Sequence, residues 1–95
     1  MTTHDLKSWP EFFKDIVFGS KHFELRRNDR GYQVGDIIVL REWEPNTKEY
    51  TGRQCARKII YVMKGLGNVG VIEPYKGLGH DFVILGLSSE AVEQP

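Results

Sequence analysis

The chain has 95 residues, of which 40% are hydrophobic and 27% are charged, and its thirteen basic residues balance thirteen acidic ones. These values indicate one domain over residues 1–95, because chains of this length rarely divide into two cores. A net charge of zero argues against a protein that coats nucleic acid through bulk electrostatics. No apolar run approaches the about 20 residues of a membrane span, and the N-terminus lacks the pattern of a signal peptide.

The single cysteine, Cys55, excludes an intrachain disulfide and the zinc patterns that need several cysteines. Cys55 falls in an expected strand, where a small core residue is more common than a nucleophile. The three histidines are scattered along the chain without ligand spacing. We therefore expect no metal site and a reducing, cytoplasmic environment.

The first expected elements are a short strand near residues 4–9 and a helix over residues 9–18. Ser8 and Glu11 have the spacing of a capping box, and Gly19 supplies a left-handed stop. Apolar residues recur at helical spacing between these signals. The residues expected to face the core are Trp9, Phe13 and Ile16.

The segment HFELRR, residues 22–27, alternates in the manner of a strand. Phe23 and Leu25 fall on one face and are expected to anchor the core. Glu24 and Arg26 fall on the other face and are expected to line whatever space the core leaves open.

The rest of the chain is rich in strand and turn signals. Further strands are expected at residues 37–40, which are apolar on both faces, and at 54–64 and 81–87, with a long hairpin loop at 44–52 and a turn at 34–36. Residues 65–80 are read as loop with a short strand at 69–72. The ordered core is expected to span about residues 3–88, with a flexible tail at 89–95.

These elements predict an α+β, mostly β fold, because a single helix cannot cover both faces of an open sheet. Five or six short strands with hairpin-sized connections favour a small barrel with one N-terminal helix packed against it. The segment GLGNVG, residues 65–70, matches a dinucleotide fingerprint, but the following Pro74, Gly77 and Gly79 preclude the helix that this motif requires. We therefore expect no cofactor.

Glu24 and Arg26 project from the same face of the expected strand, about 6.6 Å apart along the chain. Lys21 follows shortly after the helix stop, so its amine is expected near the Glu24 carboxylate. A solvated ion pair would contribute about 0–1 kcal/mol and no function. The same groups in a cleft would grip a ligand or transfer a proton. The residues alone leave both interpretations open.

The segment GSKHFELR, residues 19–26, fits the G-x-K-x-x-E-x-R signature of the ASCH domains, which are related to the PUA domains of RNA-binding proteins. HDLK, VGD and YTGR occur in order with it, and together they resemble an uncharacterised, mostly bacterial and phage subfamily of that group. The resemblance covers about residues 3–62 and then DFVILGL at 81–87. It implies a PUA-like β-barrel with a cleft lined by Lys21, Glu24 and Arg26.

The resemblance also implies a function. Many ASCH domains are proposed to bind RNA, one similar branch hydrolyses the acetyl amide of an acetylated cytidine, and another has been described as a ribonuclease. The deacetylating branch carries a threonine nucleophile three residues after the lysine, where this chain has Glu24. Threonine-dependent amide hydrolysis is therefore not implied, and any catalysis would need Glu24 as a general base beside Lys21 or Arg26.

Several basic and aromatic residues outside this signature are candidates for phosphate contacts and base stacking. Gly52 is expected to allow a bend that aims Arg53 at the cleft, and Tyr32 and Trp43 would stack on a base if they are exposed. The segment from Lys21 to Lys58 contains nine basic and six acidic residues, an excess of three positive charges. The residues expected to contact RNA or a nucleotide are Lys21, Glu24, Arg26, Arg27, Arg30, Tyr50, Thr51 and Arg53.

The sequence supports three hypotheses. The first is a module that holds a nucleobase or single-stranded RNA in a cleft. The second is an enzyme acting on a modified nucleoside or on RNA, with Lys21 and Glu24 as catalytic residues. The third is an accessory that binds a protein partner, for which an exposed apolar patch would be the sign. A monomer is the default expectation.

Overall fold

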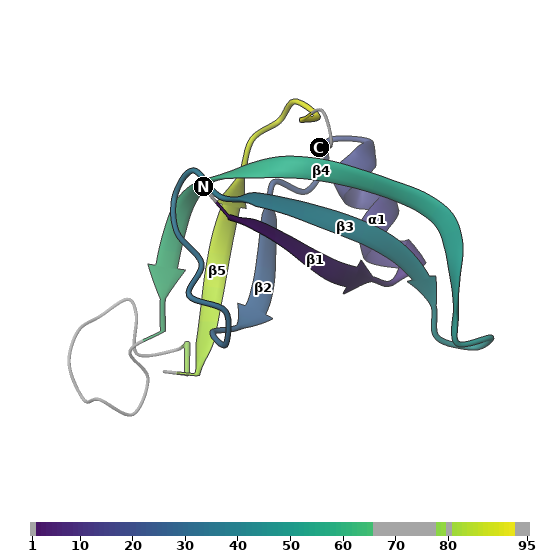
Figure 1. Cartoon of the computed structure of the whole chain (residues 1–95), viewed down its shortest axis with the longest axis horizontal. Coiled ribbons are helices and arrows are strands. Elements are labelled where there is room, and N and C mark those ends of the chain that lie inside the picture. The colour runs from purple at the N-terminus through teal and green to yellow at the C-terminus, as the bar shows by residue number, and fades with distance from the viewer. Residues whose placement is uncertain (1, 66–77, 80, 93–95) are drawn as a thin grey trace.

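The computed structural model describes residues 2–65, 78–79 and 81–92, and Figure 1 shows their arrangement as five strands and one helix. The elements are β1 (Thr3–Ser8), α1 (Pro10–Val17), β2 (Phe23–Arg27), β3 (Ile37–Glu44), β4 (Glu49–Lys64) and β5 (Phe82–Leu87). The expected α+β, mostly β fold class is confirmed. The expected short strand at 69–72 and residues 66–70 of the glycine motif lie outside the described residues. No helix in the described ranges is long and apolar enough to span a membrane.

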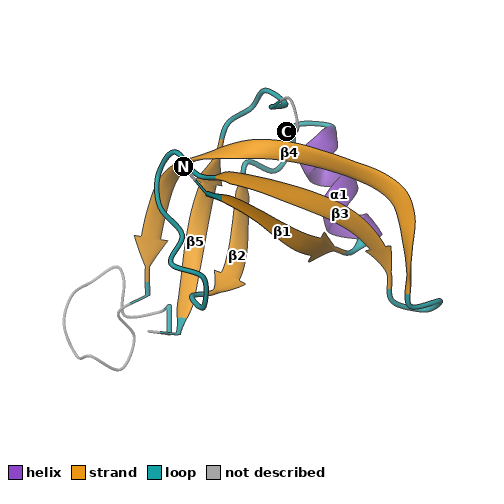
Figure 2. Cartoon of the chain, viewed as in Figure 1, coloured by secondary structure: helices purple, strands orange, loops and turns teal. Residues whose placement is uncertain are grey.

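The five strands form one strongly bent sheet in the order β1-β3-β4-β5-β2, with β1 parallel to β3 and the other pairs antiparallel. The long strand β4 crosses the whole molecule and pairs with β3 along one half and with β5 along the other (Figure 1). The helix lies beside the half that contains β1 and β3 (Figure 2).

The barrel is not closed, because β1 and β2 remain the two edges of the sheet. Two arginine side chains reach the edge of β1. Arg26 donates from Nη2 to the carbonyl oxygen of Lys7 at 2.7 Å, and Arg30 donates from Nη1 to that of Asp5 at 3.3 Å. These bonds satisfy two backbone acceptors on an edge strand and bring β1 close to β2.

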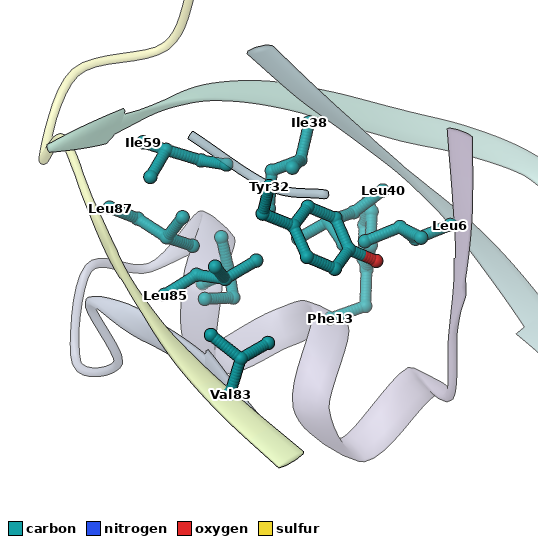
Figure 3. Packing of buried hydrophobic residues seen from close by; sticks show 10 residues of the cluster. Leu6, Phe13, Tyr32, Ile38, Leu40, Ile59, Val83, Leu85 and Leu87 are labelled. Carbon is teal, nitrogen blue, oxygen red and sulfur yellow. The ribbon is translucent and has the colours of Figure 1, made fainter. Parts of the chain in front are cut away.

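The main core lies between the sheet and α1, as Figure 3 shows for its labelled side chains. Its members come from every strand except β2, from the helix and from the loop that carries Tyr32: Leu6, Phe13, Ile16, Tyr32, Ile38, Leu40, Ile59, Val83, Leu85 and Leu87. The two-sided burial expected for residues 37–40 is confirmed, because Ile37 and Val39 pack on the opposite face with Ala56. Val92 also packs there and donates from its backbone N–H to Ala56 at 2.9 Å, so the tail contacts the sheet as far as Val92.

The start of α1 differs from the expected capping box. Trp9 is the N-cap residue, no side chain caps the helix, and the Trp9 side chain is 48% exposed instead of facing the core. Ser8 cannot cap, because it ends β1 opposite Glu42 with its side chain buried. Phe13 and Ile16 are buried as predicted.

Strand β2 turns its apolar side chains outward, although Phe23 and Leu25 were expected to anchor the core. Phe23 and Leu25 are about half exposed, whereas Glu24 is only 4% exposed. The register explains the exchange, because Glu24 lies opposite the buried Leu85 of β5 and therefore shares its inward face. The core is filled without β2, so an apolar–polar alternation on this edge strand does not indicate which face is buried.

The expected loop at 44–52 is shorter in the structure, because β4 already begins at Glu49. The pairing register with β3 shifts between Arg41 and Trp43, and Gly52 lies in this irregular part with a φ of 96°. A bulge of this kind commonly uses glycine in a left-handed conformation. Gly52 therefore allows Tyr50 and Thr51 to continue the strand.

Gly86 lies in the interior of the sheet, between Phe23 of β2 and Tyr61 of β4. A Cβ at this position would come within 3.0 Å of the Tyr61 Cβ. We expect the substitution Gly86→Ala to lower the free energy of unfolding by about 1–3 kcal/mol, because strands on both sides prevent the backbone from moving away. Urea denaturation would measure the change, and a gain in stability, as higher strand propensity alone would give, would contradict it.

Candidate nucleotide site

The three signature residues form a connected ion cluster, which we call the triad. Lys21 donates from Nζ to Glu24 Oε1 at 3.2 Å, and Arg26 donates from Nε to Glu24 Oε2 at 3.0 Å. The Glu24 carboxylate is almost fully buried, while the two cations keep part of their side chains in solvent. This geometry removes the interpretation of a freely solvated salt bridge, because both carboxylate oxygens are occupied away from water.

Local structure after α1 positions Lys21. Gly19 adopts a φ of 85°, and the backbone N–H groups of Ser20 and Lys21 both donate to the Asp15 carbonyl at 3.0 Å. This turn fixes the Lys21 backbone beside β2. Its amine then lies 5.1 Å from the ring centroid of Phe12 and 5.3 Å from that of Phe23, distances at which a cation is attracted to an aromatic face.

The triad lines a cavity of about 500 Å³ between the start of α1, the end of β1 and strand β2. We call it the triad cavity. Its other lining residues are Lys7, Ser8, Trp9, Phe12, Phe23 and Leu25. Trp9, Phe12 and Phe23 are each about half exposed, so the cavity has aromatic walls and one polar corner. Small-molecule sites commonly combine apolar walls with a few fixed polar groups.

Ser8 lines the cavity, but its hydroxyl oxygen is shielded from solvent. Its Oγ is buried and has no hydrogen-bond partner among the residues that the structure describes. Buried hydroxyl groups usually have a hydrogen-bond partner in the protein or in ordered water. Sequence reasoning missed that Ser8 and Trp9 line the cavity, because it treated Ser8 as a helix cap and Trp9 as a core residue. No local signal corrects this, since Trp9 stands four residues before the buried Phe13, a spacing that places both on one face of a helix.

The expected contacts Thr51 and Arg53 belong to a different cluster. Arg53 donates from Nε and Nη2 to the two oxygens of Glu42, each at 2.8 Å, and Thr51 donates from Oγ1 to Glu42 Oε1 at 2.7 Å. Glu42 is 1% exposed, whereas the Arg53 side chain is 70% exposed. The bidentate pair holds the bulge of β4 against β3, and Arg53 lines another cavity together with Tyr50.

The other expected contact residues are divided between two faces. Arg27 lies on the outer face of β2, with its guanidinium 5.5 Å from the Phe82 ring centroid. Arg30 and Tyr50 line a cavity of about 420 Å³ that borders the triad cavity. The stacking suggested for Tyr32 is excluded, because that ring is buried 4.7 Å from the ring of His4.

Trp43 and Cys55 have surroundings that agree with structural roles. The Lys7 amine lies 4.5 Å from the Trp43 ring centroid, so one face of this ring is already in a cation–π contact. Cys55 packs against the core, and burial raises the pKa of its thiol, which disfavours the nucleophilic thiolate. The described residues hold no group of three metal-ligating side chains.

Comparison with known proteins adds two findings. The family model described as "Domain of unknown function (DUF3850)" matches residues 3–87. The "Uncharacterized 12.9 kDa protein in GpA 3'region" of Escherichia phage P2 is 34% identical to this chain over 59 residues, which are 62% of this chain and 52% of that protein. The match therefore spans about half the length of this relative.

Proposed function

We propose that this chain, which belongs to the family described as domain of unknown function DUF3850, is an RNA- or nucleotide-binding module. In this proposal the triad cavity holds a nucleobase. The observation that carries it is the position of Lys21, Glu24 and Arg26 at one corner of a 500 Å³ cavity whose other walls include Trp9 and two phenylalanines. This combination suits a flat, polar heterocycle better than a purely apolar ligand.

The chemistry of the walls supports a base in particular. A nucleobase stacked on an aromatic side chain gains about 1–3 kcal/mol. Glu24 holds Lys21 and Arg26 in place, and the N–H donors that these two cations keep can bind carbonyl oxygens or ring nitrogens of a base. The resemblance to ASCH and PUA-like domains points to the same class of ligand.

An enzyme that acts on a modified nucleoside or on RNA is the second candidate. The observation that favours it is the amine of Lys21 at 3.2 Å from the carboxylate of Glu24 inside a cavity, an arrangement suited to general acid–base chemistry. We place binding first because Glu24 is held by two cations at once, which suits an anchoring group that does not move.

A protein-binding accessory is the third candidate. Strands β2, β4 and β5 carry exposed apolar side chains, namely Phe23, Leu25, Ile60, Tyr61 and Phe82. Two of these, Phe23 and Leu25, also line the triad cavity. Because Phe23 and Leu25 converge with polar groups around a concave site, we favour a small polar ligand over a flat apolar partner.

Fluorescence of Trp9 can test the proposed function directly. The chain has two tryptophans, so the substitution Trp43→Phe leaves Trp9 as the only one. We expect saturable quenching of Trp9 when single-stranded RNA or a set of nucleoside monophosphates is added, since a base would stack on the ring. No saturable change with RNA at tens of micromolar and low salt, and none with the monophosphates, would overturn the proposed function.

Trp9→Ala should weaken binding of the same ligands about tenfold or more, the effect expected when one base–aromatic stack is removed. Isothermal titration calorimetry would measure this loss, because the fluorophore is absent. Tyr61→Ala is the matched control, since Tyr61 is similarly exposed but lies outside the triad cavity. Equal losses for the two variants would contradict stacking on Trp9.

A further inference from the structure

The triad cavity has a basic neighbour, and the two share a wall. Lys7 and Arg26 line both the triad cavity and the adjoining cavity of about 420 Å³. Arg30, Arg41, Tyr50 and Asp5 also line this second cavity, which we call the basic cavity. The two cavities therefore adjoin at Lys7 and Arg26.

Four cations face one carboxylate in the basic cavity, and their existing contacts leave donors free. Arg30 uses one N–H on the carbonyl of Asp5 at 3.3 Å. Arg41 uses one on the Gln54 side chain at 2.7 Å, while Asp5 lies 3.6 Å from its Nη2. A guanidinium has five N–H donors, so both arginines can still bind an anion.

The acidic partners neutralise this cavity only in part. Asp29 lies 3.9 Å from Arg30 Nε and Asp5 lies 3.6 Å from Arg41, and all four side chains are about half exposed. Ion pairs of this length and exposure contribute little. Arg26 alone has a close buried partner, Glu24. The three other cations, Lys7, Arg30 and Arg41, face two carboxylates, Asp5 and Asp29, and therefore leave an excess of positive charge in a chain whose net charge is zero.

We propose that the basic cavity is a phosphate subsite, so that the ligand spans both cavities with its base in the first and a phosphate in the second. The inference rests on the proposed function and narrows its ligand class to nucleotides or RNA, instead of free bases or nucleosides. Arginine and lysine bind phosphate oxygens through charge-assisted hydrogen bonds. The exposed Tyr50 ring at the rim would contact the adjoining sugar or base.

Titration calorimetry on the complete chain can test this subsite. The ligands are a matched series of one base: the nucleoside, its 5′- and 3′-monophosphates, and a trinucleotide with unphosphorylated ends. We expect a monophosphate to bind at least about tenfold more tightly than the nucleoside, the effect of one charge-assisted contact. A gain for a monophosphate assigns the subsite to a terminal phosphate, and a gain for the trinucleotide alone assigns it to an internal phosphodiester.

The variants Arg30→Gln and Arg41→Gln should reduce this gain about tenfold while leaving nucleoside affinity unchanged. Arg27→Gln is the matched control, because it removes the same charge from the outer face of β2. Raising the salt concentration should weaken the phosphorylated ligands and leave the nucleoside unaffected. Both arginines are half exposed, and thermal unfolding would verify that the variants fold.

Nucleoside binding that equals the binding of every phosphorylated ligand would overturn the phosphate subsite and leave the base cavity standing. A phosphate gain that persists in both arginine variants would also overturn it. Absence of binding for the whole series would overturn the proposed function itself, so the two failures are distinguishable.

Discussion

Replacing Asp36 with asparagine is expected to lower the free energy of unfolding by about 2–4 kcal/mol at neutral pH. The buried Asp36 carboxylate accepts three hydrogen bonds: from the side chain of His4 at 2.9 Å and from the backbone N–H groups of Gln33 at 3.1 Å and Thr2 at 3.2 Å. An asparagine presents one oxygen and one NH2 group, so at least one donor loses its acceptor. Each buried donor left unpaired costs about 1–3 kcal/mol.

The same substitution should remove part of the acid sensitivity of the fold. Burial disfavours the Asp36 charge, but the hydrogen bonds from His4, Thr2 and Gln33 outweigh it and hold the pKa of Asp36 below its ordinary value. A lowered pKa means that the stabilisation is complete above the unfolded-state pKa near 4 and is lost as the pH falls through the lower native value. The difference between the two proteins should therefore be largest at neutral pH and shrink below about pH 4.

Urea denaturation at several pH values between 7 and 3 would measure both effects. Asp5→Asn is the matched control. Asp5 lies in β1 and carries the same charge as Asp36, but its side chain is exposed and lies 3.6 Å from the Arg41 guanidinium. We expect that control to change stability by less than about 1 kcal/mol. A loss for Asp36→Asn that is the same at every pH would contradict the role given to its ionised form.

The comparison of sequence and structure separates local signals from tertiary ones. The turn that contains Gly35, the burial of residues 37–40 on both faces and the inward positions of Phe13 and Ile16 all follow from local composition and periodicity, and the structure agrees. The faces of β2 do not follow, because they depend on the pairing of Glu24 with Leu85 of β5, 61 residues further along the chain. An alternating strand specifies two faces but not which one is covered.

The candidate site shows the same division. The spacing of Lys21, Glu24 and Arg26 placed these residues together correctly, since all three lie within one short segment. Arg53 was expected beside them, but its partner Glu42 lies on β3 and directs it to another cavity. Ser8 and Trp9 were assigned to a cap and to the core, because their exposure depends on how β1 packs beside α1. Lys7 and Arg41 had no local signal, since only the pairing of β1 with β3 makes them neighbours.

Glu24→Gln is expected to weaken binding of nucleotides or RNA by about a hundredfold or more. The carboxylate fixes Lys21 through one oxygen and Arg26 through the other, and an amide can accept from only one of them. The released cation would lose its fixed position at the cavity corner, and with it the hydrogen bond that it donates to the ligand. A charge-assisted hydrogen bond contributes about 1.5–3 kcal/mol, and the upper end of this range accounts for the expected effect.

Glu42→Gln provides the matched control for this substitution. Glu42 is also a buried carboxylate bound to an arginine, but it lies outside the triad cavity. The two variants should show similar losses in thermal stability, because each breaks a buried ion pair, whereas only Glu24→Gln should lose the ligand. Calorimetric titration with the same nucleotide would measure the affinities. Unchanged affinity in Glu24→Gln, or an equal loss in Glu42→Gln, would contradict the assignment of the triad as the binding corner.

The same pair of variants separates the binding module from the enzyme. Incubation with RNA and with a panel of acylated nucleosides would reveal turnover by the unmodified chain. If Glu24 acts as a general base, Glu24→Gln should lose turnover while a part of the ligand affinity remains, because the amide keeps the size of the side chain but cannot take a proton. If Glu24 only anchors the ligand, no turnover is expected from either protein, and affinity alone should change. We expect this second outcome, a loss of affinity without turnover, because Lys21 and Arg26 both hold the Glu24 carboxylate in place.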